Sequence, residues 1–174
     1  MHESFSPNRA VEILLYISSR LKKPTIHEVL KIQYFADKLH FSRYGFMSSG
    51  DRYVAMAFGP VGSNAYNVIK AARGDRGRYI PVSFVHAADG ALEIDGKEIR
   101  PLRDAKTEQL SEAETECLNE SIAEFGNMPF DIRTDLSHDA AWDKAWASAS
   151  KDMAVMDIVL TLPNADEVIE HLNT

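Results

Sequence analysis

The sequence contains one cysteine, Cys117, so an internal disulfide is excluded. It has no uninterrupted apolar stretch near the roughly 20 residues that a membrane-spanning helix needs. Its first residues, MHESFSPNRAVEILLY, lack the basic leader, apolar segment and small-residue cleavage site of a signal peptide. Together these absences predict a cytoplasmic protein with no membrane partner.

The sequence motifs of common catalytic and nucleotide-binding sites are also missing. There is no G-x-x-x-x-G-K-[ST], no G-x-G-x-x-G and no G-x-S-x-G. GPVGSN (59–64) places two glycines before a predicted helix, but Pro60 lacks an N–H donor and no lysine follows at the spacing of a phosphate site. Cys117 stands between Glu116 and Glu120, whose charges would raise the thiol pKa. The sequence therefore predicts no catalytic residue and no cofactor.

Metal ligation has little support. None of the six histidines falls in an H-x-x-x-H spacing, and there is no C-x-x-C. SHDAAWD (137–143) gathers acidic residues around His138, but a solvated helix start with Ser137 as its N-cap is the favoured interpretation. We expect no metal site.

What the chain has is an ordinary globular composition with an uneven distribution of charge. Hydrophobic residues make up 45% and charged residues 26%, and no repeat or linker divides the chain, which predicts one domain over residues 1–174. Residues 1–80 carry 12 Lys and Arg against 6 Asp and Glu, whereas residues 81–174 carry 7 against 20. This asymmetry indicates either a basic face for nucleic acid or an acidic partner, or two halves that lie against each other.

Periodicity and capping signals predict a mainly helical α+β fold. An amphipathic helix is expected over residues 8–21. A second helix (26–44) begins with a capping box at Thr25 and Glu28, ends at Gly45, and is apolar around most of its circumference, which is typical of a central buried helix. Later helices are expected over 110–126, with a capping box from Ser111 to Glu114, and over 164–172.

Between these helices the sequence predicts a turn at Gly50-Asp51 and an extended segment over 53–58. A helix follows, for which Pro60 is a candidate start and Ser63 or Asn64 a candidate cap. Three short antiparallel strands are expected at YIPVSFV (79–85), ALEI (91–94) and KEIRPL (97–102), with a hairpin turn at Asp95-Gly96. Residues 128–147 are expected to form a loop that leads into a helix bearing Trp142 and Trp146.

One polar stripe on the second helix is a candidate site. Gln33, Asp37, His40 and Tyr44 fall on one face. Asp37 and His40 have the spacing of an acid–imidazole dyad. The alternative, which we favour, is a polar network that docks the helix against residues 50–62, or a solvent-facing stripe, because no nucleophile or metal accompanies the dyad.

A second candidate is the basic loop over residues 70–78. Lys70, Arg73, Arg76 and Arg78 cluster there, and Tyr79 adjoins them, as in a nucleic-acid contact. A solvated loop is the favoured interpretation, because no helix-turn-helix pattern is evident.

The segment KIQYFADKLHFSRYG, followed by SGDRYVAMAFGPVGSNAYNVI, resembles the Panacea domain, also called the SocA-like or phage-associated GepA-like family of antitoxins. LSEAETECLNESIAEFG and SHDAAWDKA resemble later parts of the family pattern, so the resemblance covers about residues 10–147 and leaves 150–174 as a C-terminal helical extension. The motif positions are Lys31, Tyr34, Ala36, His40, Gly50, Tyr53, Ala55, Gly59, Pro60 and Val61.

The resemblance implies an antitoxin, and not an enzyme, that neutralises a toxin encoded nearby by direct protein–protein binding. In some family members the antitoxin is reported to hand the toxin to an ATP-dependent protease. Two alternatives stay open: a small hydrolase or transferase that uses Asp37 and His40, and a DNA-binding regulator that acts through the 70–78 loop. The candidates for partner-binding or fold-defining roles are Asp37, His40, Tyr53, Gly59, Pro60, Val61, Arg73 and Arg76.

Overall fold

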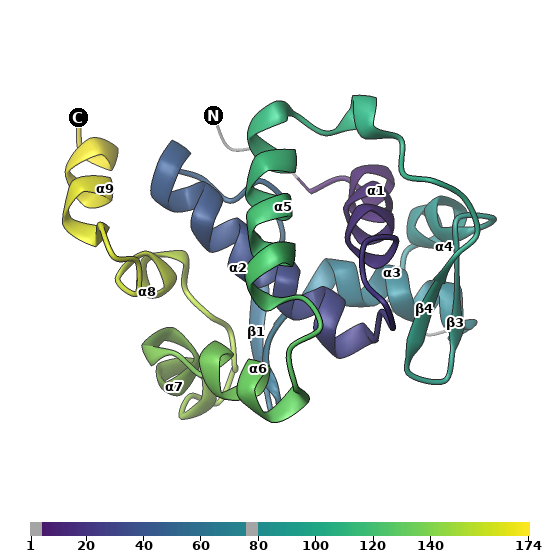
Figure 1. Cartoon of the computed structure of the whole chain (residues 1–174). Helices are drawn as coiled ribbons and strands as arrows, with labels where there is room; N and C mark the ends of the chain where they lie inside the picture. The colour runs from purple at the N-terminus through teal and green to yellow at the C-terminus, as the bar shows by residue number, and fades with distance from the viewer. Residues whose placement is uncertain (1–4, 76–79) are drawn as a thin grey trace.

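The computed structural model describes residues 5–75 and 80–174. It has the predicted mainly helical α+β fold, in which helices surround one central helix and two small antiparallel sheets (Figure 1). The helices are α1 (Pro7–Ser18), α2 (Ile26–Tyr44), α3 (Ser63–Arg73), α4 (Val82–Ala88), a short 3-10 helix η1 (Thr107–Gln109), α5 (Glu112–Phe125), α6 (Phe130–Ser137), α7 (Ala140–Trp146), α8 (Val155–Val159) and α9 (Ala165–Leu172). The strands are β1 (Tyr53–Met56), β2 (Gly59–Gly62), β3 (Leu92–Asp95) and β4 (Glu98–Pro101).

The central helix α2 has the predicted bounds. The Thr25 hydroxyl accepts a hydrogen bond from the Glu28 backbone N–H at 3.1 Å, and Gly45 ends the helix in the left-handed region at φ +80°. The Glu28 carboxylate accepts from the Asn127 backbone N–H at 2.9 Å, so the predicted capping box has only its Thr25 half. Because α2 is buried over most of its length, it divides the hydrophobic interior into two clusters.

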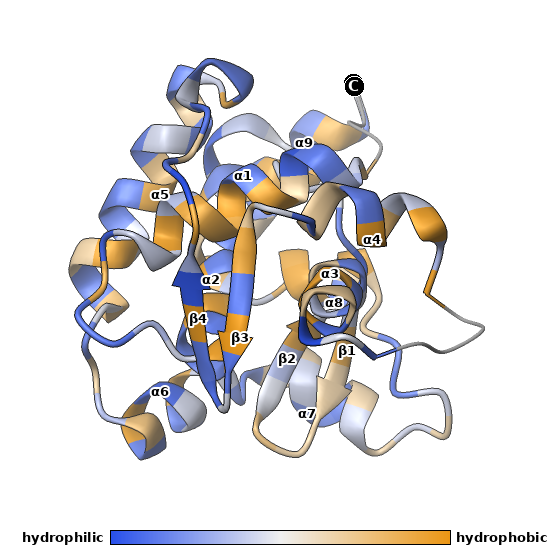
Figure 2. Cartoon of the chain, turned by 90° about the vertical axis from the view of Figure 1, so that its right-hand side faces the viewer, coloured by the Kyte–Doolittle hydropathy of each residue, from blue (hydrophilic) through white to orange (hydrophobic). Residues whose placement is uncertain are grey.

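The first cluster lies between α1, α3, α4 and the β3–β4 hairpin, which lie on the right-hand side of Figure 1 and face the viewer in Figure 2. The second contains the other side of α2, β1, α7, α8 and α9. The C-terminal segment is attached by backbone hydrogen bonds to β1, from Ala55 N–H to the Lys151 carbonyl at 2.8 Å and from Met153 N–H to the Tyr53 carbonyl at 3.0 Å. Among the described residues, every helix is too short or too polar to span a bilayer.

The prediction that a helix begins at Pro60 is wrong. Pro60 lies in β2 opposite Ala55, and α3 begins three residues later at Ser63. Neither Ser63 nor Asn64 caps this helix, because its N-cap residue is Gly62 and has no side chain. The helix is capped instead by the carboxylate of Asp51, which precedes it in the chain and accepts hydrogen bonds from the backbone N–H groups of Asn64 at 3.0 Å and Ala65 at 2.9 Å.

The prediction of three strands between residues 79 and 102 is correct only for the last two. The β3–β4 hairpin is confirmed, but it turns one residue later than expected, at Gly96-Lys97, because Asp95 pairs with Glu98. Gly96 has φ +61°. From Val82 onward, the segment expected as the first strand belongs to helix α4, which buries Phe84 and Ala88 four residues apart; Tyr79 lies outside the described residues. Burial of this pair against α1 and α3 outweighs the β propensity of the segment.

The region after Gly126 is more helical than predicted. The capping box of α5 is confirmed, but the loop expected after it contains α6. The N-cap of α7 is Asp139, whose carboxylate accepts from the Trp142 N–H at 3.0 Å, and not Ser137, whose hydroxyl donates to the Thr134 carbonyl inside the protein. The helix over 164–172 is confirmed as α9, and α8 precedes it.

Candidate functional site

The carboxylate of Asp37 lies at the centre of a buried polar cluster. It is 2% exposed and accepts hydrogen bonds from the Ser49 N–H at 3.0 Å and from three hydroxyl groups. These hydroxyls belong to Ser48 (3.2 Å), Ser49 (2.5 Å) and Tyr53 (2.7 Å). Four donors fill its capacity as an acceptor, so they hold the carboxylate in place within the interior.

Gln33 connects this cluster to the start of α3. Its amide nitrogen lies 3.2 Å from Asp51 Oδ2 and 3.4 Å from the Tyr53 hydroxyl. Burial raises the pKa of Asp51, while the backbone N–H groups of Ala65, Asn64 and Arg52 act in the opposite direction by stabilising the charged form. Gln33, Asp37, Asp51 and Tyr53 therefore form one network that joins α2, β1 and α3.

Beside the network, Lys31 donates a hydrogen bond from Nζ to the Pro60 carbonyl at 2.7 Å. This lysine is 1% exposed, and burial, with a smaller effect from Arg133, lowers its pKa to about 7. Gly59, with φ at +115°, lets the backbone pass close to the lysine. A Cβ atom at Gly59 would lie 2.5 Å from Lys31 Cε and 2.3 Å from Ser137 Oγ.

The depressed pKa of Lys31 predicts a pH-dependent stability. Between pH 7 and the ordinary lysine value of 10.5, the unfolded chain binds the proton more strongly than the folded one, so stability rises with pH in this window. Relative to Lys31→Met, we expect the free energy of unfolding of the unmodified chain to rise by about 1 kcal/mol per pH unit between pH 7 and 9. Urea denaturation of both proteins at pH 6, 7, 8 and 9 measures this difference. Parallel pH profiles would contradict it.

The structure does not join His40 to Asp37. The Nδ1 atom of His40 lies 2.9 Å from the Phe46 carbonyl, and its ring packs against Tyr44 and Phe46 at centroid distances of 4.7 and 4.8 Å. Among the described residues, no hydrogen bond links the imidazole to Asp37, whose oxygens are occupied by the serines and Tyr53. The two residues share a helix face but belong to different sets of contacts.

The remaining candidates are distributed between the network and a distant loop. Gly59, Pro60 and Val61 are buried in β2 beside Lys31. Arg73 lies at the other end of α3, roughly 15 Å along the helix axis from Gly62. Its guanidinium pairs with Asp75 at 2.8 Å, and this pairing raises its pKa. Arg76 lies outside the described residues.

Two further features bear on chemistry. Cys117 is buried, and burial raises the pKa of its thiol. Over residues 5–75 and 80–174, no three His, Cys, Asp or Glu side chains gather as metal ligands would.

Sequence reasoning missed several members of the network. Lys31 was identified only as a motif position, and Asp51 only as part of a turn. Ser48 and Ser49 carried no signal at all. Their contacts span 11 to 29 residues along the chain, so no helical or strand spacing encodes them.

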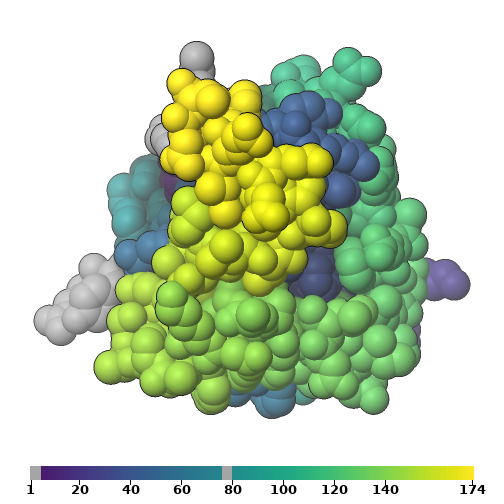
Figure 3. Space-filling model, turned by 90° about the vertical axis from the view of Figure 1, so that its left-hand side faces the viewer, coloured from purple at the N-terminus to yellow at the C-terminus, as the bar shows by residue number. Residues whose placement is uncertain are grey.

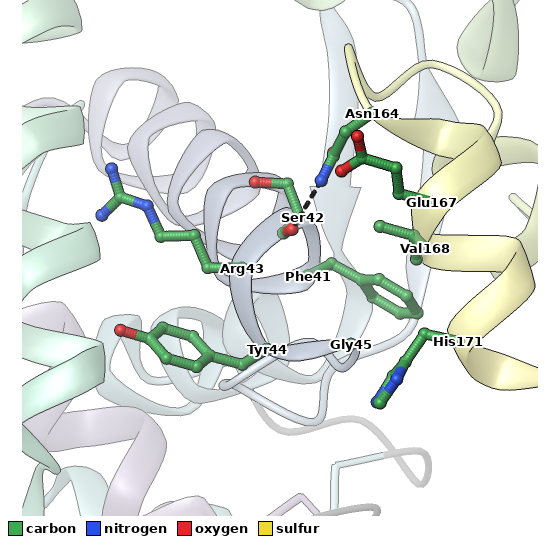
Figure 4. Close-up of a pocket in the computed structure, with 9 residues that line it drawn as sticks. All are labelled: Phe41, Ser42, Arg43, Tyr44, Gly45, Asn164, Glu167, Val168 and His171. Carbon is green, nitrogen blue, oxygen red and sulfur yellow. Dashed lines mark hydrogen bonds between the residues drawn. The ribbon is translucent and has the colours of Figure 1, made fainter. Parts of the chain in front are cut away.

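The molecular surface has two hollows along the C-terminal half of α2. The smaller, of about 220 Å³, lies between the end of α2 and α9, where Glu167, Val168 and His171 face Phe41 and Ser42 (Figure 4). The larger, of about 440 Å³, lies between α2, α5, α6 and the segment before α9. In Figure 3 the blue side chains of α2 are visible between the yellow C-terminal segment and the green of α5 and α6.

Comparison with protein families gave one match. The family model described as antitoxin SocA-like, Panacea domain, matches residues 29–143, a range that begins in the first turn of α2, ends within α7 and includes both sheets. The matched range contains the whole buried polar network. Searches of curated proteins and of solved structures gave no significant match.

Proposed function

The chain belongs to the antitoxin SocA-like, Panacea domain family, and from this premise we propose that it neutralises a cognate toxin protein by binding it directly. The match over residues 29–143 of the 174 carries the proposal. An antitoxin that acts by contact needs a rigid surface and no reactive group. The partner is a protein encoded by a neighbouring gene, and the proposed compartment is the cytoplasm.

The buried network supports a binding scaffold. Asp37, His40 and Tyr53 are each at most 2% exposed, so a partner docked on the outer surface would not touch them. We assign them, together with Gly59, Pro60 and Val61, to fold definition. Tyr53 joins β1 to Asp37 of α2, the Pro60 carbonyl joins β2 to Lys31 of α2, and the neighbouring Asp51 caps α3. These contacts hold the surrounding surface in one shape.

The two alternatives have weaker support. A hydrolase or transferase would need Asp37 to orient His40, but the carboxylate is directed to Ser48, Ser49 and Tyr53. A DNA-binding regulator would need free cations in the 70–78 loop, but Arg73 is paired with Asp75 and the Lys70 ammonium lies over the Tyr66 ring at 4.6 Å. Delivery of bound toxin to an ATP-dependent protease is compatible with direct binding and stays a separate proposal.

The direct test is coexpression with the product of the neighbouring gene. We expect that product to arrest growth when expressed alone, and this chain to restore growth and to co-elute with it in gel filtration. Coexpression of an unrelated protein of similar size and acidity is the control. A neighbour that is not toxic, or a toxicity relieved without any complex, would overturn neutralisation by direct binding.

A further inference from the structure

The two hollows form one groove with an apolar floor. They meet at Ser42, and residues Pro163 and Asn164 continue the wall from one to the other. The floor of the larger hollow comes from Phe35 and Leu39 of α2, Phe125 of α5 and Leu162, while Leu136 of α6 lies at its edge and is 50% exposed. The α2 residues that line the groove, 35–44, span about 14 Å, the length of between two and three helical turns.

The rim of this groove is acidic. Glu116, Glu120 and Glu124 follow one another at intervals of four along α5, so they form a stripe on one face, and Glu167 stands on the α9 side.

The cations at the groove are already paired. Arg43 contacts Glu120 at 2.7 Å and Glu116 at 3.5 Å, and Lys38 contacts Asp139 at 3.0 Å. Glu124 and Glu167 have no ion pair or hydrogen bond with any residue in the described part of the chain. The groove therefore presents two uncompensated carboxylates, one on each side of an apolar floor.

Only part of the groove lining falls within the residues that match the family model. The parts of α2, α5 and α6 that line it fall within the matched residues 29–143, whereas residues 161–171, which form the opposite wall, fall outside them. The groove is therefore bounded by the part of the chain that matches the family model on one side and by the C-terminal segment outside that match on the other.

We propose that this groove is the docking site for the cognate toxin, and that it takes a short amphipathic helix of the toxin with an apolar face and basic flanks. The inference rests on the proposed antitoxin function and deepens it. The apolar face of such a helix would cover Leu39, Phe125 and Leu136, as in other helix-in-groove complexes. Lysine or arginine on its two edges would reach Glu124 and Glu167, which favours a basic partner and speeds its encounter with the groove.

The rim is tested by charge reversal with a matched control. In the full chain, Glu124→Lys with Glu167→Lys is expected to weaken affinity for the purified neighbouring gene product at least tenfold and to flatten the dependence of affinity on salt. Glu98→Lys with Glu108→Lys makes the same change of net charge at exposed positions on β4 and η1, in the other half of the molecule, and should alter affinity less than twofold. Circular dichroism and thermal melts establish that both variants are folded.

The floor is tested without any change of charge. Leu39→Gln with Leu136→Gln should weaken binding at least tenfold while the melting temperature stays within a few degrees. If the folded rim and floor variants bind as tightly as the unmodified chain, the groove is not the docking site, although the antitoxin function stands. If light scattering shows a dimer that the floor variant converts to monomers with unchanged toxin affinity, the occupant is a second copy and the inference is wrong. If the unmodified chain neither binds nor rescues, the proposed function itself fails.

Discussion

Replacement of Gly59 by alanine is expected to lower the free energy of unfolding by about 2–6 kcal/mol, through backbone strain of about 1–3 kcal/mol and overpacking of similar size. The strain arises because Gly59 has φ at +115°, a conformation that side chains with a Cβ rarely adopt. The overpacking arises because the new methyl group would lie 2.3 Å from Ser137 Oγ and 2.5 Å from Lys31 Cε. To avoid contact with the new methyl group, the buried Lys31 side chain would have to move away from the Pro60 carbonyl, and the hydrogen bond between them would be lost.

The matched control is Gly90→Ala. Gly90 also has a positive φ, +69°, but a Cβ atom there would meet nothing within 4 Å, so only the backbone cost of about 1–2 kcal/mol is expected. Urea denaturation of the two variants beside the unmodified chain separates strain from crowding. Equal losses at the two positions would show that the contact between β2, Lys31 and α6 is not tight.

The features predicted best from sequence are those encoded within a few residues. The bounds of α2 follow from Thr25 and Gly45, because a side-chain cap and a left-handed glycine act on the helix end beside them. The Ser111–Glu114 box and the β3–β4 hairpin succeed for the same reason, although the hairpin turns at Gly96-Lys97, one residue later than predicted.

The errors have the opposite origin. The cap of α3 comes from Asp51, 13 and 14 residues before the N–H groups that it accepts from, so a search for a contiguous cap selects the wrong residues. Helix α4 was predicted as a strand because its β-branched residues favour extended structure, whereas its burial of Phe84 and Ala88 depends on α1 and α3.

The candidate site contains both residues that the sequence predicts and contacts that it does not. The stripe containing Gln33 and Asp37 is periodic, so the sequence predicts that the two side chains share one face of the helix. From that shared face, a polar network with residues 50–62 is a natural interpretation. Which donors reach the Asp37 carboxylate depends on how the chain returns at Ser48, Ser49 and Tyr53. The groove is further from prediction, since α2 and the segment 161–171, which both line it, are more than 100 residues apart and are adjacent only after folding.

Replacement of Asp37 by alanine is the second change with a large expected effect. The substitution recovers the cost of burying a carboxylate, but it leaves the Ser49 N–H and the hydroxyls of Ser48, Ser49 and Tyr53 without their acceptor. Because each unsatisfied buried donor costs about 1–3 kcal/mol, we expect a net loss of about 3–4 kcal/mol in the free energy of unfolding. Tyr53→Phe removes one donor and leaves the carboxylate bonded to the serines, so its loss should be about 1–2 kcal/mol.

The same pair of variants distinguishes a fold-defining Asp37 from one that contacts the toxin. If Asp37 holds the scaffold, toxin binding by Asp37→Ala falls in proportion to the unfolded fraction, and it recovers at a temperature where the variant is folded, because the groove beside α2 is then intact. Thermal melts followed by circular dichroism, with affinity measured below each melting point, provide both quantities. An unchanged melting temperature together with lost affinity would place Asp37 in the interface and contradict its assignment to the buried network. A residue that is only 2% exposed can reach a partner only if β1 and the 48–51 turn move away from α2.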